Sequence, residues 1–184
     1  KATLEKVSES FGHCTLMLAD SLQRFNLKIN SPSSSFKMLH DSANQFGDSW
    51  LERNKSIIEK SLKIPFEIVR WDDFLAEPDF KHNRELVEIM YNENSTFKKV
   101  VFNQAKEYIM RLDKNNNNQN WLNVLKYSTQ YLLEECAAKL TFSKLGFDFE
   151  IYPSSLTRHP MQQIFDLLAC TNKLPTIRLF FYKN

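Results

Sequence analysis

The sequence predicts an α/β domain with a mostly parallel sheet and helices on its faces. Short apolar runs that have the character of strands alternate with long segments of helical periodicity, and this alternation is typical of parallel sheets. The chain has 184 residues, and single domains usually have roughly 100–200 residues. Because no internal repeat or change in composition divides the chain, we expect residues 1–184 to form one domain.

Three short apolar segments, each followed by polar residues or proline, are the predicted strands. They are residues 13–19, 66–71 and 147–152. The first leads into Asp20 and Ser21, which we expect to cap the helix that follows. Ligands bind beyond the carboxyl ends of the strands in such sheets. We therefore expect residues 20–21, 71–72 and 152–153 to lie near one another.

Three further segments have helical periodicity. They are residues 42–62, residues 84–112 with a weak point at 92–95, and residues 121–145 ended by Gly146 as a C-cap. In the first of these helices an apolar stripe should face the core, and it consists of Ala43, Phe46, Trp50, Ile57 and Ile58. Residues 31–35 are a predicted loop, and residues 115–120 (NNNNQN) are polar and of low complexity.

Composition excludes several classes of function. With 24 basic and 22 acidic residues, the net charge of +2 is too small to indicate nucleic-acid binding by itself. The three cysteines have no paired spacing and suggest buried thiols in a reducing compartment, and no spacing typical of metal ligands occurs. The three glycines form no phosphate-binding loop. No apolar run reaches the ~18–20 residues of a membrane helix, so we expect a cytoplasmic protein without metal or cofactor.

Residues 127–140 (YSTQYLLEECAAKL) form the most informative segment. Tyr131 and Glu135 are four residues apart and share a helix face, which Ser128 and Ala138 extend with small groups. A carboxylate in such a place could hold a substrate ammonium and take its proton. Periodicity alone favours an amphipathic helix with a core tyrosine and a surface glutamate. Glu134 is about 100° away on the helix and is expected outside this face.

Five segments in the same order resemble one family. They are ATLEKVSESFGHCTLMLADSLQRF at 2–25, GDSWLERN at 47–54, EIVRWDDFLAEPDF at 67–80, YLLEECA at 131–137 and EIYP at 150–153. Together they resemble the tRNA-dependent cyclodipeptide synthases, and the Tyr-Pro pair indicates the branch named for that motif, the XYP subfamily. The match runs from Ala2 to about Pro153, and the tail after Leu156 matches poorly.

The resemblance implies a Rossmann-like three-layer sandwich, similar to the catalytic domains of class I tyrosyl- and tryptophanyl-tRNA synthetases. It implies an aminoacyltransferase that uses no ATP or other cofactor. Such an enzyme takes aminoacyl groups from two aminoacyl-tRNAs and passes them through a covalent seryl enzyme. The product is a cyclic dipeptide (a 2,5-diketopiperazine). The family is mostly monomeric, so a monomer is expected.

The resemblance also gives roles to three residues. Tyr131 and Glu135 would hold the amino group of the first aminoacyl moiety, and Glu135 would transfer protons during peptide-bond formation. Tyr152 would orient the nucleophilic serine and assist cyclisation. That serine follows the family's first strand, upstream of the helix that begins here near Ala2, so we expect it before Lys1.

A basic stripe on the predicted helix 42–62 is a candidate for phosphate contacts. It contains no acid and consists of Ser49, Arg53, Ser56, Lys60 and Lys63. Such a stripe can follow phosphates, and the family uses this helix to bind tRNA, so Arg53, Lys60 and Lys63 are the predicted tRNA-binding residues. An ordinary solvated face is the alternative. No aromatic residue interleaves with the stripe, and Lys55 should be neutralised by its acidic neighbours. A weaker basic group consists of Lys98, Lys99, Lys106 and Arg111.

Two other functions stay open. One is a non-catalytic Rossmann-like module that binds tRNA or a protein. The other, a synthetase that uses ATP, is disfavoured because HIGH-like and KMSKS-like motifs are absent. The histidines have no acid or serine at a spacing that indicates catalysis. We interpret His13 as the start of a strand and His40, His82 and His159 as surface residues, which disfavours a Ser/His/Asp hydrolase.

Overall fold

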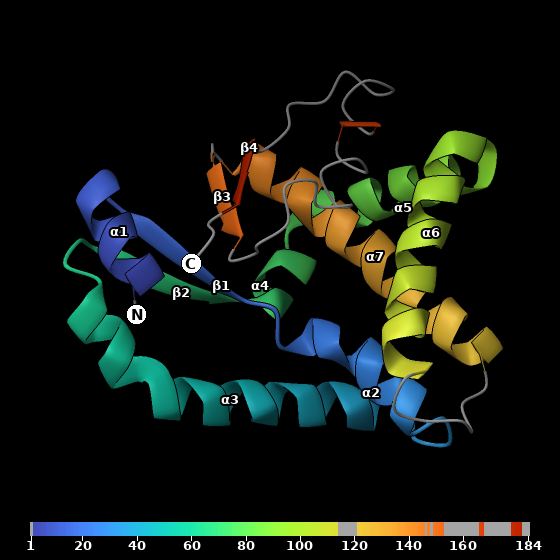
Figure 1. Cartoon of the computed structure of the whole chain (residues 1–184), viewed down its shortest axis with the longest axis horizontal. Helices are drawn as coiled ribbons and strands as arrows, with labels where there is room; N and C mark the ends of the chain where they lie inside the picture. Colours follow the sequence, from blue (N-terminus) through green and yellow to red (C-terminus); the bar gives the residue numbers. More distant parts are fainter. Residues whose placement is uncertain are drawn as a thin grey trace.

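The computed structural model of the chain describes residues 2–113, 121–145, 147, 149–152, 166–167 and 178–181. Its helices are α1 (Ala2–Ser10), the short 3-10 helix η1 (Ser21–Gln23), α2 (Arg24–Asn30), α3 (Phe36–Ser61), α4 (Trp71–Leu75), α5 (Pro78–Glu93), α6 (Ser95–Asp113) and α7 (Trp121–Lys144). Its strands are β1 (Cys14–Leu18), β2 (Phe66–Arg70), β3 (Phe149–Tyr152) and β4 (Arg178–Phe181). The predicted mixed α/β architecture is confirmed (Figure 1).

The strands form two parallel pairs. β1 pairs with β2, with Leu16 opposite Ile68, and β3 pairs with β4, with Ile151 opposite Phe180. The three predicted strands and their parallel arrangement are confirmed. β4 was not predicted, because it lies in the tail where the sequence carries no recognised pattern.

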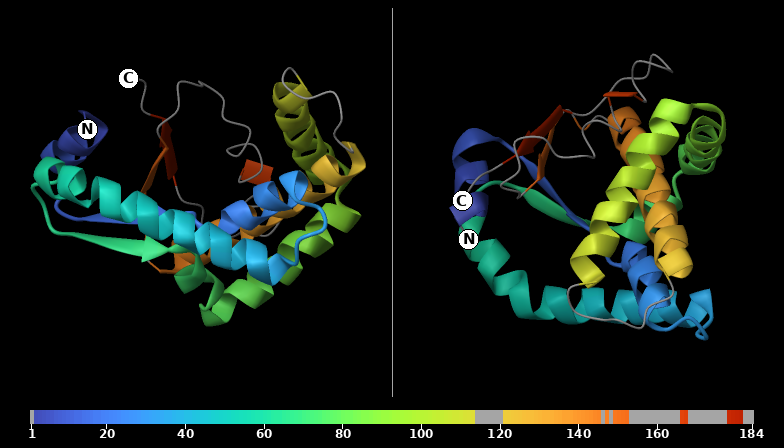
Figure 2. Two further views of the ribbon diagram at one scale, coloured as in Figure 1. Left: turned by 90° about the horizontal axis from the view of Figure 1, so that it is seen from below. Right: turned by 45° about the vertical axis from the view of Figure 1, so that its right-hand side comes forward.

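A small core lies where helices cover the β1–β2 pair. Its buried residues are Val7 from α1 and Ile58 and Leu62 at the end of α3, and half-buried residues of both strands pack against them. Ile151 of β3 packs against the same cluster. The β3–β4 pair therefore lies beside the β1–β2 pair, although the described residues share no strand hydrogen bonds between the pairs (Figure 2).

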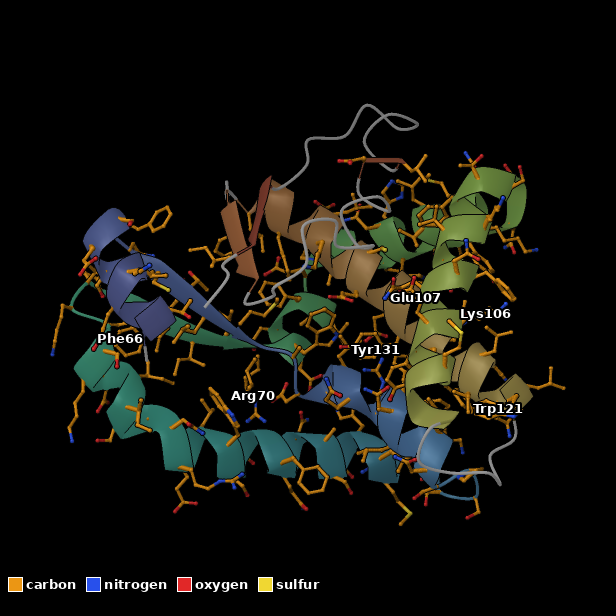
Figure 3. The ribbon with its side chains drawn as sticks, in the orientation of Figure 1. Phe66, Arg70, Lys106, Glu107, Trp121 and Tyr131 are labelled. Atoms are coloured by element: carbon orange, nitrogen blue, oxygen red, sulfur yellow. The ribbon has the colours of Figure 1, made fainter. Side chains whose placement is uncertain are left out.

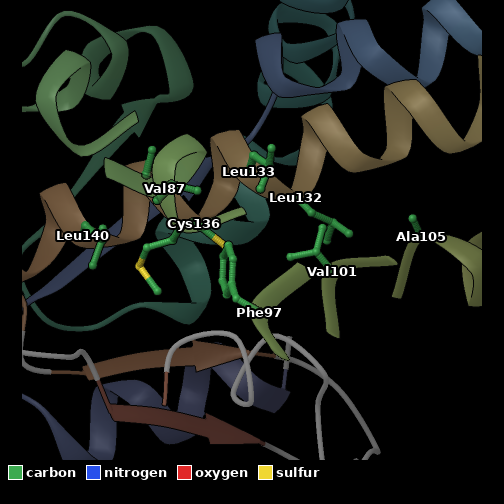
Figure 4. Packing of buried hydrophobic residues seen from close by; sticks show 10 residues of the cluster. Val87, Phe97, Val101, Ala105, Leu132, Leu133, Cys136 and Leu140 are labelled. Atoms are coloured by element: carbon green, nitrogen blue, oxygen red, sulfur yellow. The ribbon is translucent and has the colours of Figure 1, made fainter. Parts of the chain in front are cut away.

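Helix α7 is the central element of the larger core. On one side its residues Leu133, Cys136 and Leu140 pack against Val87 of α5 and Phe97 of α6 (Figure 4). On another side, Ala138 and Phe142 belong to a cluster that includes η1, α2 and α4 and consists of Leu22, Phe25, Trp71, Phe74, Ala138 and Phe142. All residues from 132 to 142 are buried. Helix α7 is thus enclosed by its neighbours, and its side chains reach both clusters.

Helix α3 differs from its prediction. It begins six residues earlier, where the Ser35 hydroxyl accepts a hydrogen bond from the Met38 N–H at 3.2 Å and caps the helix. Ala43 and Ile58 face the core as predicted, but Phe46, Trp50 and Ile57 are 62%, 43% and 48% exposed. The prediction that these three side chains face the core is wrong, because the helix runs along one side of the molecule and packs through a narrower face (Figures 1 and 2).

The other two predicted helical segments are confirmed, except that the segment predicted from residue 84 begins six residues earlier, with α5. The predicted weak point at 92–95 is the break between α5 and α6, where the Asn94 side chain accepts a hydrogen bond from the Phe97 N–H at 2.9 Å. α5 begins at Pro78, a residue suited to the first turn of a helix. Gly146 and residues 115–120 lie outside the described residues. Among the helices that the structure describes, none is long and apolar enough to cross a membrane.

Candidate functional site

The carboxyl ends of β1 and β2 are joined through Asp20. Its side chain is buried and accepts hydrogen bonds from the backbone N–H groups of Ser21 at 2.9 Å and Trp71 at 3.3 Å. The bond to Ser21 is the predicted cap of the helical turn that follows β1. The predicted proximity of residues 20–21 and 71–72 is therefore confirmed. The same prediction placed residues 152–153, at the end of the third strand, near this edge, and Pro153 lies outside the described residues.

Asp72 is the centre of a polar network at this edge. The Ser21 hydroxyl donates to Asp72 Oδ1 at 2.5 Å, and His40 Nε2 and Asn44 Nδ2 each lie 2.9 Å from Oδ2. Burial by itself would raise the pKa of Asp72, but the hydrogen bonds from Ser21, Asn44 and His40 outweigh it, and the pKa is lowered. Asp72 is therefore held as a carboxylate.

This network corrects the interpretation of His40. The sequence placed it on the surface without an acidic partner, yet the fold brings it to Asp72, 32 residues away. The carboxylate lies between the serine and the imidazole, whereas a hydrolytic triad needs the imidazole between them. The network therefore does not indicate a hydrolase.

Arg70 connects the strand ends to α3. Its guanidinium donates to Asp20 Oδ2 at 2.6 Å, Asp48 Oδ1 at 2.5 Å and the Asn44 carbonyl at 2.9 Å (Figure 3). Burial would lower the pKa of Arg70, but the bonds to the two carboxylates raise it. A Cβ at Gly47 would lie 2.6 Å from Asp20 Oδ2 and 2.9 Å from Arg70 Nη2, so this close approach of α3 requires glycine.

Glu134 connects α7 to the same edge. It accepts a hydrogen bond from the Trp71 indole N–H at 2.9 Å and forms an ion pair with Arg24, which also donates to the Ser21 carbonyl at 2.9 Å. Glu134 had no predicted role, because it lies off the face of Tyr131 and Glu135. The structure shows instead that Glu134 is buried and links three elements.

Tyr131 and Glu135 lie on α7 beside this framework. Tyr131 is half-buried and packs against the cluster that contains Leu22 and Phe25. Glu135 is 8% exposed, so it is not the surface glutamate of the alternative interpretation. Lys139 is 3% exposed, and its Nζ lies 3.9 Å from Glu135 Oε1. Sequence reasoning missed Lys139, although its spacing of four residues from Glu135 could have indicated it.

Ser128 and Ala138 are both buried near Tyr131 and Glu135 along α7. The Ser128 hydroxyl has no hydrogen-bond partner among the residues that the structure describes. Tyr152 ends β3, where its backbone is opposite Phe181 of β4. The structure thus brings Tyr131 and Glu135 together on one buried face, and Tyr152 comes from the separate strand pair.

The basic residues lie elsewhere, along α3. Arg53 and Lys60 are exposed on the helix, and Lys63 is exposed just after its end, where its N–H donates to the Ser8 hydroxyl at 2.8 Å. The Arg53 side chain also donates to the Ser49 carbonyl at 2.9 Å. Trp50 is three residues before Arg53 and therefore its neighbour on the helix surface. The expectation that no aromatic residue interleaves with the stripe is thus wrong.

No metal site is formed by the described side chains: no group of three or more His, Cys, Asp or Glu among them could hold an ion. Cys136 is buried and Cys14 half-buried, and both are free thiols. Burial raises the pKa of both, and for Cys136 well above its usual value. Cys170 lies outside the described residues.

The arrangement of these elements defines a Rossmann-like α/β fold, and solved structures with the same fold are cyclodipeptide synthases. The chain is 27% identical to a CDPS from Fluoribacter dumoffii, with a TM-score of 0.87 over 98% of this chain and 79% of that one. It is 20% identical to the cyclodipeptide synthase from Candidatus Glomeribacter gigasporarum bound to Phe-tRNAPhe, with a TM-score of 0.70 over 98% and 74% of the two chains.

A cyclo(L-leucyl-L-phenylalanyl) synthase has a TM-score of 0.63 at 13% identity, over 89% of this chain and 72% of that one. No protein-family model and no curated protein matches the sequence. The predicted fold is confirmed, and so is the prediction of an enzyme, since the structural neighbours are synthases. The likenesses support the cyclodipeptide synthase family. The Tyr-Pro branch stays a prediction.

Proposed function

We propose that this chain acts as a cyclodipeptide synthase, which joins aminoacyl groups from two aminoacyl-tRNAs into a cyclic dipeptide. The observation that carries the proposal is the likeness to the CDPS from Fluoribacter dumoffii over 98% of the chain. The buried Tyr131–Glu135 face of α7 supports it, because the sequence resemblance assigns the substrate amino group to these two residues. The Tyr-Pro branch and a cytoplasmic location belong to the same proposal.

In the proposed reaction, Glu135 holds the ammonium of the first aminoacyl group as a carboxylate, and the Tyr131 hydroxyl adds a hydrogen bond. A buried carboxylate needs compensation to stay charged. Lys139 contributes to it, since its ammonium lies 3.9 Å from Glu135 Oε1. When the substrate amine must become a nucleophile, Glu135 is the nearest group of this face that can accept its proton.

The covalent step uses a serine that we place outside the described residues. Its oxygen attacks the ester of the first aminoacyl-tRNA, and the tRNA leaves with its ribose hydroxyl reprotonated. The amine of this aminoacyl-enzyme then attacks the ester of the second aminoacyl-tRNA, which gives a dipeptidyl-enzyme and releases the second tRNA with its ribose hydroxyl protonated. Finally, the free amine of the dipeptide attacks the seryl ester, which releases the ring and restores the serine. Tyr152 orients the serine in this proposal.

The sheet supports a strand that carries this serine. Each strand of the two pairs is bonded on one side only among the described residues, and Ile151 of β3 packs against the cluster that includes Leu16 of β1 and Ile68 of β2. A further parallel strand between the two pairs would join them into one sheet. Its carboxyl end would then lie beside the ends of its neighbours, where ligands bind in such sheets.

We also propose that the exposed side chains of Arg53, Lys60 and Lys63 bind tRNA phosphates. Among the described residues none of the three forms an ion pair with an acidic side chain, and the helix that carries Arg53 and Lys60 runs along one side of the molecule (Figure 2). The network of Arg70, Asp48 and Asn44 fixes α3 to the strand ends. A tRNA bound along α3 would therefore be held at a fixed position relative to the β1–β2 edge.

The experiment that tests the function is product analysis. Expression of the intact gene in a bacterium should yield diketopiperazines in the medium, detected by mass spectrometry against an empty-vector control. Absence of any cyclic dipeptide above that control would reject the enzymatic proposal and favour a non-catalytic module that binds tRNA or a protein.

A further inference from the structure

Ser128 carries an unusual hydroxyl. The residue is 5% exposed in the middle of α7, and its Oγ has no hydrogen-bond partner among the described residues. A serine inside a helix commonly bonds to the carbonyl four residues before it, yet Ser128 does not. Leaving a buried hydroxyl unpaired costs about 1–3 kcal/mol, so a partner that arrives with a ligand would recover this interaction.

The position of Ser128 places it on the proposed substrate face. At about 100° per residue, Ser128 lies within roughly 20° of Glu135 and 60° of Tyr131 around the helix axis. Tyr131 packs against the cluster of Leu22 and Phe25, whereas Leu132 belongs to the cluster of α5 and α6. Around the helix axis, Ser128 therefore lies between the side chains that face the two core clusters, at nearly the same angle as Glu135.

The spacing along α7 indicates which part of a substrate Ser128 would meet. Its Cα is about 10.5 Å from that of Glu135 along the axis, at 1.5 Å per residue, with Tyr131 between them. The proposed function places the α-ammonium between Tyr131 and Glu135. The ester must stay with the tRNA and the serine nucleophile. Only the amino-acid side chain is long enough and free to extend a further turn along the helix.

We infer that the Ser128 hydroxyl hydrogen-bonds the side chain of the first amino acid. It thereby selects an amino acid whose side chain carries a hydroxyl or another hydrogen-bonding group. A serine hydroxyl both donates and accepts hydrogen bonds, so it can bond to such a group. A purely apolar side chain offers it no hydrogen-bond partner. This inference rests on the proposed function, because it names the substrate class of that same site.

The test compares two aminoacyl-tRNAs that differ by one hydroxyl at the end of a long side chain, those of Tyr and Phe. The intact gene product should make more cyclic dipeptide from Tyr than from Phe, by about 3- to 10-fold for one hydrogen bond. In Ser128→Ala this preference should fall to near parity.

Ser61 provides a matched control. It is also a buried serine whose Oγ has no partner among the described residues, but it lies at the end of α3, far from Tyr131 in the chain. Ser61→Ala should keep the wild-type preference, and thermal unfolding should show that both variants fold. An unchanged preference in a folded Ser128→Ala variant that still forms product would overturn the inference alone. Absence of product from the wild-type protein would overturn the proposed function as well.

Discussion

The indole N–H of Trp71 donates to Glu134 Oε1 at 2.9 Å, and this bond ties the end of β2 to the middle of α7. Arg24 pairs with the other carboxylate oxygen of Glu134, so α2 joins the same point. Since Glu134 and Glu135 are consecutive, one residue fixes the helix to the strand edge while the next lies on the proposed substrate face. Their different roles lead to different predictions.

Replacing Glu134 by glutamine should destabilise the fold. The variant keeps an acceptor for Trp71 but leaves the Arg24 guanidinium without its anionic partner, and breaking a buried ion pair costs about 3 kcal/mol or more. Urea denaturation measures the change in the free energy of unfolding. Glu52→Gln, on the exposed surface of α3, is the control and should change it by less than about 0.5 kcal/mol. Equal effects of the two changes would show that the Arg24–Glu134 pair contributes nothing.

Glu135→Gln should remove activity in a protein that still folds, although the loss of the anionic partner of Lys139 lowers its stability. The change keeps the shape of the side chain but removes the charge that we propose binds the substrate ammonium and the base that we propose accepts its proton. A lost general base typically costs about 10²–10⁴-fold in rate. Cyclic dipeptide formation and circular dichroism are the two measurements, and Glu85→Gln, an exposed residue of α5, is the control. Full activity of Glu135→Gln would contradict both roles.

Gly47→Ala tests the close approach of α3 to the strand ends. In most helices this change stabilises by about 1 kcal/mol, because alanine has the higher helix propensity. Here the new Cβ would lie 2.6 Å from Asp20 Oδ2 and 2.7 Å from Asp20 Cβ. We therefore expect a destabilisation of about 1–3 kcal/mol, as for overpacked cores. Gly12→Ala meets nothing within 4 Å and should be nearly neutral in the same thermal unfolding experiment.

The lowered pKa of Asp72 predicts a dependence of stability on pH. In the unfolded chain the pKa of an aspartate is about 3.9, and in the folded protein that of Asp72 is lower. Its contribution to the free energy of unfolding is therefore fully present above about pH 4. It is lost as the pH falls through the folded value.

Urea denaturation of the wild type and Asp72→Asn at several pH values measures this contribution. The difference in stability between the two should be constant between about pH 5 and 7 and should shrink below about pH 4. Asp41→Asn, which removes an exposed pair with Lys37, serves as the control and should show little difference at any pH. A gap that widens in acid would contradict the direction of the shift.

The basic residues of α3 predict a salt dependence of tRNA binding. Replacing Arg53, Lys60 and Lys63 together by alanine should weaken binding of all aminoacyl-tRNAs alike. The slope of log affinity against log salt should fall by about 0.7–0.9 for each tRNA phosphate that these side chains no longer neutralise. Filter binding at several salt concentrations measures it. Lys55→Ala should matter less, since its neighbours are acidic. If the slope stays unchanged, the α3 face is ordinary solvated surface, and Lys98, Lys99 and Lys106 become the next candidates.

The elements were predictable where one physical signal defines them. The apolar runs indicated β1, β2 and β3, and Asn94 marked the break between α5 and α6. The start of α3 was missed because the predicted loop at 31–35 hid it, and the Ser35 cap before Phe36 is the signal that marks it. Phe46 and Trp50 were predicted to face the core because helical periodicity puts them on the same side of the helix as Ala43. The width of the buried face depends on what covers the helix, and the helix sequence does not contain that information.

The candidate site was predictable only where the spacing of residues within one helix defines it. Spacing on one helix put Tyr131 and Glu135 together, and it could have added Lys139. Contacts between distant segments had no such signal: His40 meets Asp72 across 32 residues, and Arg24 meets Glu134 across 110. Such partners depend on the packing of whole elements, and the helix phase of Glu134 could not show that Trp71 and Arg24 would surround it.

The enclosure of α7 has a consequence for how this protein can diverge. Each residue from 132 to 142 is buried, so nearly any change there disturbs a neighbouring side chain. Mutational drift should therefore be slow along this stretch. New substrate preferences would arise more readily from shorter surrounding segments, or from positions nearer the start of the helix. We therefore expect the buried stretch of α7 to change less than the segments that surround it.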